Sequence, residues 1–254
     1  MNPILETRGL TKAFGGVVAV SRLDLTVAGG ITAIIGPNGA GKTTLFNLIA
    51  GVYQPTAGSI AFQGKLLNGV LAHDRVRLGI ARTFQHIQLF GNMSAVENVM
   101  TGRHARSSYG VFEAAFKAPK WRREEEEIRL KAARYLNLVG LGARASHEAL
   151  ALPYGQQKLL AIARALATEP KLLLLDEPGA GLNTMEKAEL GELIQRLRDM
   201  GVAILLVEHD MDLVMRIADR VVVLDFGEKI AEGTPSQVQR DRRVITAYLG
   251  EEVP

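Results

Sequence analysis

The sequence contains no cysteine, and this absence removes several kinds of chemistry from consideration. A chain without thiols forms no disulfide framework, no cysteine-ligated zinc site and no thiol nucleophile. It also lacks any apolar run near the roughly 20 residues of a membrane-spanning helix, since its longest runs, 172–175 and 202–207, are strand-sized. The first residues do not show the basic-then-apolar pattern of a secretory signal. Any membrane role is therefore expected to depend on a partner.

A strong excess of charge is missing as well. Lys and Arg total 30 against 27 acidic residues, which gives a formal net charge of only +3, and no basic tract dominates the chain. The charge balance therefore gives no support for nucleic acid as a partner. With 254 residues and 47% hydrophobic content, the chain is long and apolar enough for one large folded domain or two small ones.

Strand and helix patterns alternate over most of the chain. Alternation over 22–27 and short apolar runs predict strands, and segments of helical spacing between them predict helices. This order is typical of a mostly parallel sheet covered on both faces, so we expect an α/β fold. The predicted strands are 31–35, 59–63, 80–84, 171–175, 202–207 and 221–224, and the later helices are 156–167, 184–200, 211–218 and one opening at Thr234-Pro235.

The middle of the chain, from about 87 to 152, has helix signals without strand signals. Ser94 and Glu97 form a candidate capping box. A helix is expected over 122–139, and the acidic run 124–127 suits its solvated first turn better than a metal cluster. Residues 107–121, which mix aromatic and small side chains, are interpreted as an insertion. We therefore expect a helical segment inserted into the sheet domain.

A glycine-rich loop between a predicted strand and a predicted helix matches the pattern G-x-x-x-x-G-K-[ST]. Its glycines let successive N–H groups point into one concavity, which binds phosphate together with the helix N-terminus. A chance glycine turn would lack the correct flanks. Lys42 is expected on the β- and γ-phosphates of ATP and Thr43 on Mg²⁺. The nucleotide-binding loop comprises Gly36, Pro37, Asn38, Gly39, Ala40, Gly41, Lys42, Thr43 and Thr44.

A second motif places Asp176 and Glu177 directly after an apolar strand. Ligands bind at this end of strands in open α/β sheets, so Asp176 is expected to hold the metal and Glu177 to polarise the attacking water. Alone, the pair could equally be two solvated acids at a strand end. Beside a phosphate-binding loop, the catalytic interpretation is favoured.

Three single residues fit the same site with weaker signals. Gln85 could contact Mg²⁺ or the attacking water, although a loop glutamine is usually surface. His209 could hydrogen-bond the γ-phosphate, although a histidine at a strand end is more often structural. Phe14 could stack on adenine, although an aromatic in an early loop is normally part of the core.

One further segment opens the helix that leads to Asp176: Leu152, Pro153, Tyr154, Gly155 and Gln156. The glycine and the helix N-terminus make this end favourable for an anion. It would compete with the glycine-rich loop for the same phosphate, so a second nucleotide on another subunit is the more natural target.

Taken together in this order, these motifs resemble an ATP-binding cassette ATPase over essentially the whole chain. The resemblance implies one ABC ATPase domain over 1–254, with a RecA-like core and an antiparallel β subdomain over 1–86 and 156–254. Residues 87–155 would form the helical subdomain. It also implies a head-to-tail dimer that holds two ATP molecules, each between one glycine-rich loop and the opposite signature 152–156. Coupling helices of membrane permease subunits would be gripped at the helical subdomain near Gln85.

Finer details resemble one subgroup, the ATPases of high-affinity branched-chain amino-acid importers and of related amide or urea importers. The segments that show this resemblance are 82–90, 93–100, 177–183, 207–211 and 247–251, together with the Pro-Tyr signature. The resemblance implies a peripheral subunit on the cytoplasmic face of the inner membrane, which works indirectly with a solute-binding protein. The alternatives are an exporter ATPase of the lipopolysaccharide type and a soluble assembly or repair ATPase. The sequence shows no sustained heptads, which disfavours a chromosome-maintenance ATPase with its coiled-coil insertion. It contains one P-loop, whereas a translation-factor cassette carries two ATPase halves in one chain.

The chain departs from the common family pattern at two places. Pro153 stands where serine is usual and offers neither a hydroxyl nor an N–H, and Tyr154 replaces a glycine. Asn183 stands where most members carry Asp. These departures suggest unequal ATP sites and a second, non-identical ATPase as partner.

Overall fold

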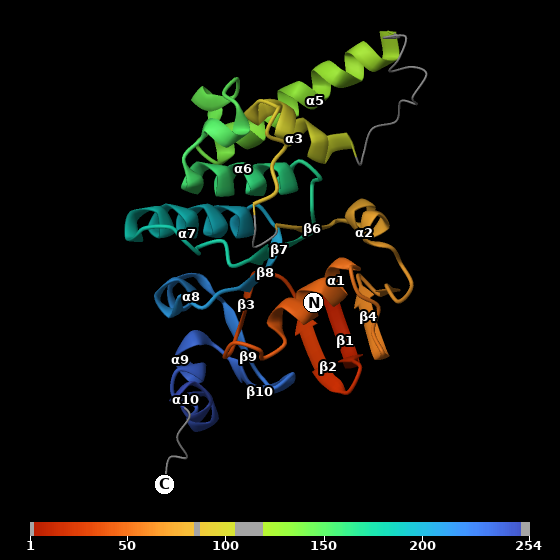
Figure 1. The fold of residues 1–254 in the computed structure, drawn as a ribbon, viewed down its shortest axis with the longest axis vertical. Helices are drawn as coiled ribbons and strands as arrows, with labels where there is room; N and C mark the ends of the chain where they lie inside the picture. The colour runs from red at the N-terminus through yellow and green to blue at the C-terminus, as the bar shows by residue number, and fades with distance from the viewer. Residues whose placement is uncertain (1–2, 84–86, 105–118, 250–254) are drawn as a thin grey trace. The chain divides into compact units, whose positions relative to one another are not determined.

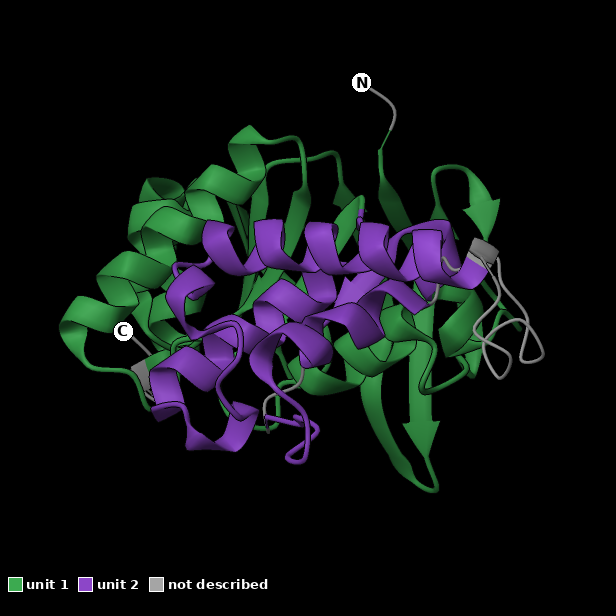
Figure 2. Ribbon diagram, turned by 90° about the horizontal axis from the view of Figure 1, so that it is seen from above, with its two compact units in different colours: residues 1–75, 171–254 green, residues 76–170 purple. Residues whose placement is uncertain are grey.

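The computed structural model describes residues 3–83, 87–104 and 119–249, so Gln85 and residues 107–118 of the predicted insertion lie outside the described part. The chain divides into two compact units, which Figure 2 colours separately. Unit 1 comprises residues 1–75 and 171–254, and unit 2 comprises residues 76–170. Within the described ranges, no helix is both long and apolar enough to cross a membrane.

The larger sheet of unit 1 is mostly parallel. Within this unit its order is β10-β9-β3-β8-β7, and only β10 runs antiparallel to its neighbour. Every residue of β3, β7 and β8 is buried, as expected for parallel strands covered on both faces. The strands are β3 (Ile31–Ile35), β7 (Leu172–Asp176), β8 (Ala203–Val207), β9 (Arg220–Asp225) and β10 (Glu228–Gly233).

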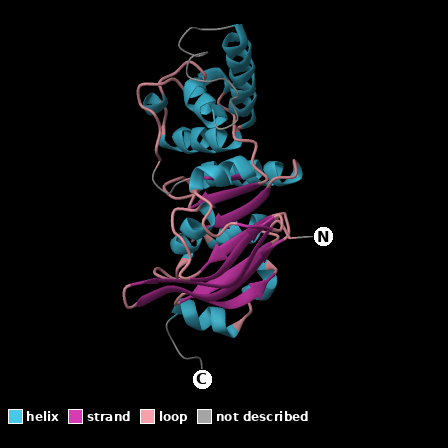
Figure 3. Cartoon of the chain, turned by 90° about the vertical axis from the view of Figure 1, so that its right-hand side faces the viewer, coloured by secondary structure: helices cyan, strands magenta, loops and turns pink. Residues whose placement is uncertain are grey.

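A second sheet in unit 1 is antiparallel and has the order β2-β1-β4-β5. Figure 3 draws the strands of the chain in magenta. Inward residues of β2 alternate with exposed ones, which agrees with the alternation seen in the sequence over 22–27. Its strands are β1 (Leu5–Phe14), β2 (Val17–Val27), β4 (Ala57–Phe62) and β5 (Lys65–Leu66). The mixed α/β fold predicted from the strand–helix alternation is confirmed, and so is the antiparallel sheet implied by the resemblance.

Helices of unit 1 follow the strands (Figure 1). On one side of the large sheet, Ile35 and Val223 pack with Val214 of α8, Val238 of α9 and Val244 of α10 in one buried cluster. The C-terminal helix is thereby fixed beside the strand that leads into the glycine-rich loop. The helices are α1 (Lys42–Ala50), α7 (Thr184–Asp199), α8 (Met211–Ile217), α9 (Pro235–Val238) and α10 (Arg242–Leu249).

Arg75 is a buried cation at the far end of α1, with only 1% of its surface exposed. Its guanidinium donates to the carbonyl oxygens of Leu48 and Ile49 in the last turn of α1, at 2.6 and 2.9 Å, and to those of Leu67 and Val70. Burial lowers the pKa of Arg75 to about 10, so the group stays charged at neutral pH. It satisfies carbonyls that the helix end leaves free.

Unit 2 is mainly helical. In α5, residues Ile128, Ala132 and Leu136 are at most 5% exposed, as is Val139 directly after the helix, which confirms the predicted apolar face. The predicted capping box of Ser94 is present at the start of α3. The elements are β6 (Ile80–Arg82), α3 (Ala95–Arg103), α5 (Pro119–Leu138), η2 (Gly142–Arg144), η3 (Ala149–Ala151) and α6 (Tyr154–Leu166), while α2 (Ala72–Leu78) spans the boundary between the units.

Several expectations about elements were wrong. The helix α6 begins at Tyr154 rather than at residue 156, because Pro153 already has the extended backbone of an N-cap, with φ −52° and ψ 150°. Strand β1 and the edge strand β10 were not expected, and neither was helix α10. Phe14 ends strand β1 instead of lying in an early loop, and it is 44% exposed rather than part of the core.

Candidate functional site

The carboxyl ends of three parallel strands bring the main candidate residues of unit 1 to one edge of the sheet. Ile34 of β3 and Asp176 of β7 both align with Val207 of β8. The segments that follow these strands therefore start side by side: the glycine-rich loop after β3, Glu177 after β7 and His209 after β8. Parallel registers thus bring together residues that are far apart in the sequence.

The glycine-rich loop is pressed against neighbouring backbone at two positions. Gly36 has φ 150°, and a Cβ there would lie 2.0 Å from the carbonyl oxygen of Leu224. Gly41 has φ 95°, and a Cβ there would lie 2.3 Å from the carbonyl oxygen of Ala19. Side chains are excluded by both the backbone angle and the space. The backbone of the surrounding strands therefore restricts the loop to one conformation.

Helix α1 opens directly from this loop with a positively charged start. Its N-cap, Gly41, provides no side-chain hydrogen bond, and its first turn carries no acidic residue. The Lys42 ammonium, on a residue only 8% exposed, donates to the carbonyl oxygens of Gly36 at 2.7 Å and Pro37 at 2.8 Å. Burial lowers the pKa of Lys42, and the nearby charges of Glu177 and Asp176 partly oppose that shift. Free helix N–H groups and a cation form a donor set suited to phosphate.

The two carboxylates after β7 differ in their surroundings. Asp176 is 3% exposed, whereas Glu177 keeps 21% of its side chain exposed. Glu177 has φ 48°, a left-handed conformation that is costly for a residue with a side chain, and its N–H donates to the carbonyl oxygen of Val207 at 2.9 Å. The Nδ1 atom of His209, whose side chain is 63% exposed, lies 3.9 Å from Oε2 of Glu177. Glu177 and His209, which the sequence predicts separately for the same site, therefore lie near each other.

The oxygen-bearing groups at this edge suit Mg²⁺. Thr43 is exposed at the start of α1, and Asp176 ends β7 close enough to Lys42 to affect its pKa. In the described ranges no three His, Asp or Glu side chains cluster as a metal cage, and the run 124–127 is no exception. A site with one carboxylate and one hydroxyl fits Mg²⁺, which usually keeps waters and takes substrate phosphates as further ligands.

Phe14 lies at the end of β1 as an exposed ring with a fixed neighbourhood. The Tyr53 ring meets it edge-on, with centroids 5.2 Å apart. The Lys12 ammonium lies 5.0 Å from the Phe14 ring centroid and 5.7 Å from that of Tyr53. An exposed aromatic held by two contacts can offer a surface for stacking.

In unit 2, the predicted signature forms the start of α6. Pro153 is its N-cap and makes no side-chain hydrogen bond, and Tyr154 is 50% exposed with the Lys158 ammonium 5.6 Å from its ring centroid. Leu152 is buried, and its carbonyl oxygen accepts a hydrogen bond from Gln157 at 2.9 Å. The start of α6 is therefore exposed and has no side-chain cap, and the buried Leu152 anchors it.

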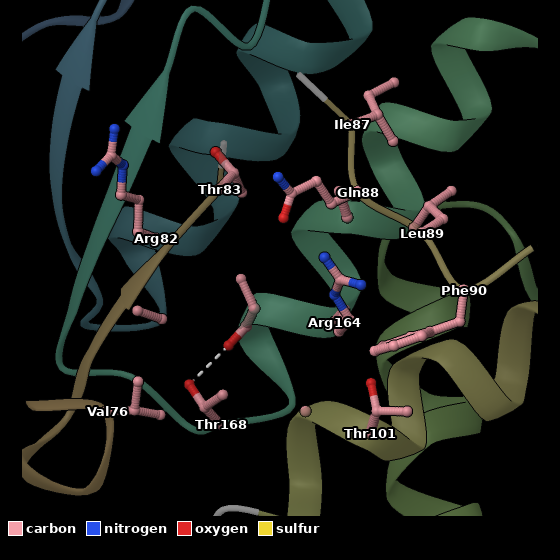
Figure 4. Close-up of a pocket in the computed structure, with 14 residues that line it drawn as sticks. Val76, Arg82, Thr83, Ile87, Gln88, Leu89, Phe90, Thr101, Arg164 and Thr168 are labelled. Atoms are coloured by element: carbon pink, nitrogen blue, oxygen red, sulfur yellow. Dashed lines mark hydrogen bonds between the residues drawn. The ribbon is translucent and has the colours of Figure 1, made fainter. Parts of the chain in front are cut away.

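A hollow of about 450 Å³ lies within unit 2 (Figure 4). Its walls include Gln88, Leu89 and Phe90, the segment directly after the residues around Gln85, together with Arg164 of α6. The Arg164 guanidinium stands 5.7 Å from the Phe90 ring centroid, and burial lowers the pKa of Arg164. The lining is thus mainly apolar, with two arginines, Arg82 and Arg164.

One buried residue at the carboxyl edge of the sheet was not predicted from the sequence. Glu208, directly after β8, is 1% exposed and was not singled out beside His209. A glutamate next to an entirely apolar strand is the only signal the sequence carries, and glutamate at a strand end is usually solvated.

Comparison with known proteins gives a consistent result. The profile of the ABC transporter family matches residues 20–180, and that of the branched-chain amino acid ATP-binding cassette transporters matches residues 228–254. The chain is 47% identical to the high-affinity branched-chain amino acid transport ATP-binding protein BraF of Pseudomonas aeruginosa over 98% of both chains. It is 45% identical to LivG of Escherichia coli K12, which has the same description, again over 98% of both.

Solved structures extend the similarity to three dimensions. The fold resembles an ATP-binding cassette of an ABC transporter in its ADP conformation, with a TM-score of 0.86 and 32% identity, over 99% of this chain and 100% of that one.

Proposed function

The chain belongs to the ABC transporter family, and from this premise we propose that it is the ATP-hydrolysing subunit of an importer for branched-chain amino acids. One observation carries the substrate class: 47% and 45% identity over nearly the full length to two ATPases described for that transport. The match to the branched-chain amino acid cassette profile at residues 228–254 supports it independently. Importers of amides or ureas remain the second candidate class, since related cassettes serve them.

In the proposed site, residues 36–44 and the start of α1 bind the phosphates of ATP through backbone N–H groups. Lys42 exchanges its two carbonyl partners for phosphate oxygens, which compensates its buried charge. Thr43 and Asp176 supply oxygen ligands for Mg²⁺, which when bound neutralises charge that develops on the phosphates. Phe14 offers its exposed ring to the adenine.

Hydrolysis in this proposal depends on Glu177, which polarises the attacking water as general base or orienting group. His209, 3.9 Å from it, supports Glu177 and contacts the γ-phosphate. Gln85 is proposed to contact the metal or the water. It lies outside the described residues, so its place rests on the resemblance alone.

The complete reaction is proposed to need a second chain. The exposed start of α6, at 152–156, would face the ATP bound by a partner ATPase, as in the head-to-tail dimers that the resemblance implies. Pro153 provides no N–H and no hydroxyl to that nucleotide, so the two sites of the dimer would be unequal. A non-identical ATPase is therefore the proposed partner.

Membrane subunits complete the assembly. The hollow beside 87–90 has the apolar lining that suits an amphipathic helix, and we assign it to a coupling helix of a permease subunit. We further propose that the chain lies peripherally on the cytoplasmic face of the inner membrane, with a solute-binding protein acting through the permeases.

Reconstitution tests this function. The chain is co-expressed with its genetically neighbouring permeases, partner ATPase and binding protein, and the assembly is placed in proteoliposomes. We expect leucine, isoleucine or valine to stimulate ATP hydrolysis and to accumulate inside the vesicles. If urea or a short amide stimulates ATP hydrolysis instead, the chain belongs to the second candidate class of importers. If the chain assembles with no permease subunit, the proposal of an importer ATPase is excluded.

A further inference from the structure

Glu208 is a buried carboxylate without a part in the proposed ATP site. It lies between β8 and α8 and is 1% exposed (Figure 1). Burying a carboxylate is costly unless hydrogen bonds hold the charge, so a residue chosen only for packing would be apolar here. The neighbouring residues of β8 are all apolar, which shows that the sheet itself does not need an acid.

Its two oxygens accept hydrogen bonds from two different loops. Oε1 accepts from the N–H of Gly179, at 2.6 Å, in the turn that follows Glu177. Oε2 accepts from the N–H of His209 at 3.1 Å and from that of Asp210 at 3.4 Å. One side chain therefore binds the backbone of both loops that carry the proposed catalytic residues.

The Gly179 contact is too close to leave room for a side chain. A Cβ on Gly179 would lie 2.7 Å from Oε1 of Glu208 and 3.3 Å from Cδ2 of Leu213. The backbone of the turn is thus pressed directly onto the carboxylate. Small displacements of that carboxylate must move the turn.

The turn also holds Glu177 in an unfavourable conformation. Its φ of 48° lies in the left-handed region and persists only where surrounding contacts enforce it. Two hydrogen bonds hold the backbone around Glu177. The Glu177 N–H donates to the Val207 carbonyl oxygen at 2.9 Å, and the Gly179 N–H donates to the Glu208 carboxylate. Both acceptors belong to β8 or to the residue after it.

The His209 loop is fixed from the other side. Asp210 caps α8 through the N–H of Leu213 and accepts a hydrogen bond from the Lys187 ammonium at 2.5 Å. The Glu208 carboxylate therefore has rigid structure on one side and the strained turn on the other. The Glu208 carboxylate connects the His209 loop to the turn of Glu177.

We propose that Glu208 is a positioning residue that ties the turn of Glu177 to the loop of His209 and so sets the distance between these two side chains. The proposal rests on the catalytic roles proposed above for Glu177 and His209. It concerns the catalytic step and not the binding of nucleotide, because the Glu208 carboxylate bonds Gly179, His209 and Asp210, which all lie outside the glycine-rich loop.

The test is Glu208→Gln in the full-length chain, with ATP hydrolysis measured over a range of ATP concentrations. The amide keeps the shape but replaces one accepting oxygen with a donor, so one of the two loops loses its partner. We expect kcat to fall by about tenfold or more while KM changes by less than about twofold. Ile217→Val, a small core change in α8, is the control for a mere loss of stability.

A second variant keeps the proposal testable if Glu208→Gln does not fold. Gly179→Ala leaves the carboxylate in place and pushes against it, and we expect the same fall in kcat with an unchanged KM. Wild-type kcat in either folded variant overturns the proposal, and so does a fall in kcat no larger than that of the Ile217→Val control. Glu177→Gln is measured alongside: if it retains turnover, the proposed catalytic site fails, whereas its loss with normal Glu208→Gln overturns only this inference.

Discussion

The starts of α1 and α6 are alike in one respect and different from other helix starts in the chain. Neither has a side-chain hydrogen bond at its N-cap, which is Gly41 in one and Pro153 in the other. Helices α3, α7 and α9, by contrast, begin with complete capping boxes at Ser94, Asn183 and Thr234. A capping oxygen occupies the N–H groups that an anion would need, so the absence of one at α1 and α6 is compatible with the phosphate-binding role proposed for these two ends.

The two open ends differ in how they are built. At α1 the loop is confined by strand backbone, and a buried lysine stands at the first helical position. At α6 the residue after the cap, Tyr154, is half exposed, and the lysine beneath it contacts its ring. In the proposed function, the first end binds the nucleotide of this chain, and the second is proposed to face a nucleotide held by another molecule.

Glu177→Gln should give the largest effect and separates chemistry from binding at the α1 end. We expect kcat for ATP hydrolysis to fall by about 10²–10⁴-fold, because a general base is removed, while nucleotide affinity stays near wild type. Steady-state hydrolysis and calorimetric titration with ATP measure the two quantities. Wild-type turnover would remove Glu177 from its proposed role.

Lys42→Ala tests binding at the same end. Loss of a charge-assisted contact worth about 1.5–3 kcal/mol should weaken ATP affinity by about 10- to 150-fold. Lys158→Ala, at the α6 end, is the matched control and should leave the affinity of the isolated chain unchanged. Equal losses in both variants would contradict the distinction between the two ends.

Asn183→Ala removes the capping box of a helix that binds no phosphate. Asn183 accepts from the Glu186 N–H at 2.9 Å, and the Glu186 carboxylate accepts from the Asn183 N–H at 2.9 Å. We expect a loss of about 0.5–2 kcal/mol in the free energy of unfolding, measured by urea denaturation. Asn183→Asp retains the cap and should cost much less, so a similar loss would point to a role of the amide beyond capping.

Pro153→Ser should have the smallest effect and the opposite sign. The backbone at 153 already has N-cap geometry, so a serine hydroxyl can close the open end of α6. We expect a gain of about 1 kcal/mol in unfolding free energy. No gain in the same urea measurement would mean that the end is satisfied by other means.

The parts of the site that sequence reasoning could predict are those where chemistry and local structure coincide. The loop 36–44, Asp176 and Glu177 stand at the ends of apolar strands, so pattern and motif point to the same place. The capping box at Ser94 was predictable because it is local. The roles of the residues at these positions stay predictions.

What could not be predicted depends on long-range packing. Strand β10 buries only Ala231 among its six residues, so its alternation is too weak to recognise. Glu208 and Arg75 carry charges that usually face water, and only the folded chain reveals the backbone groups they bind. The positive φ of Glu177 has no sequence signal, because the residue after an apolar strand is free to take many conformations.

Arg75 has a consequence for how nucleotide and folding are coupled. With its guanidinium at the tail of α1 and Lys42 at the head, both ends of one short helix carry a buried or nearly buried cation. The charge at the tail suits the helix dipole, whereas the charge at the head opposes it. ATP brings negative charge to the head of α1, so its binding is expected to reduce the repulsion between Lys42 and the helix dipole. ATP at 100 times its Kd should therefore protect the fold by about 2.7 kcal/mol, which makes heat resistance itself a gauge of occupancy.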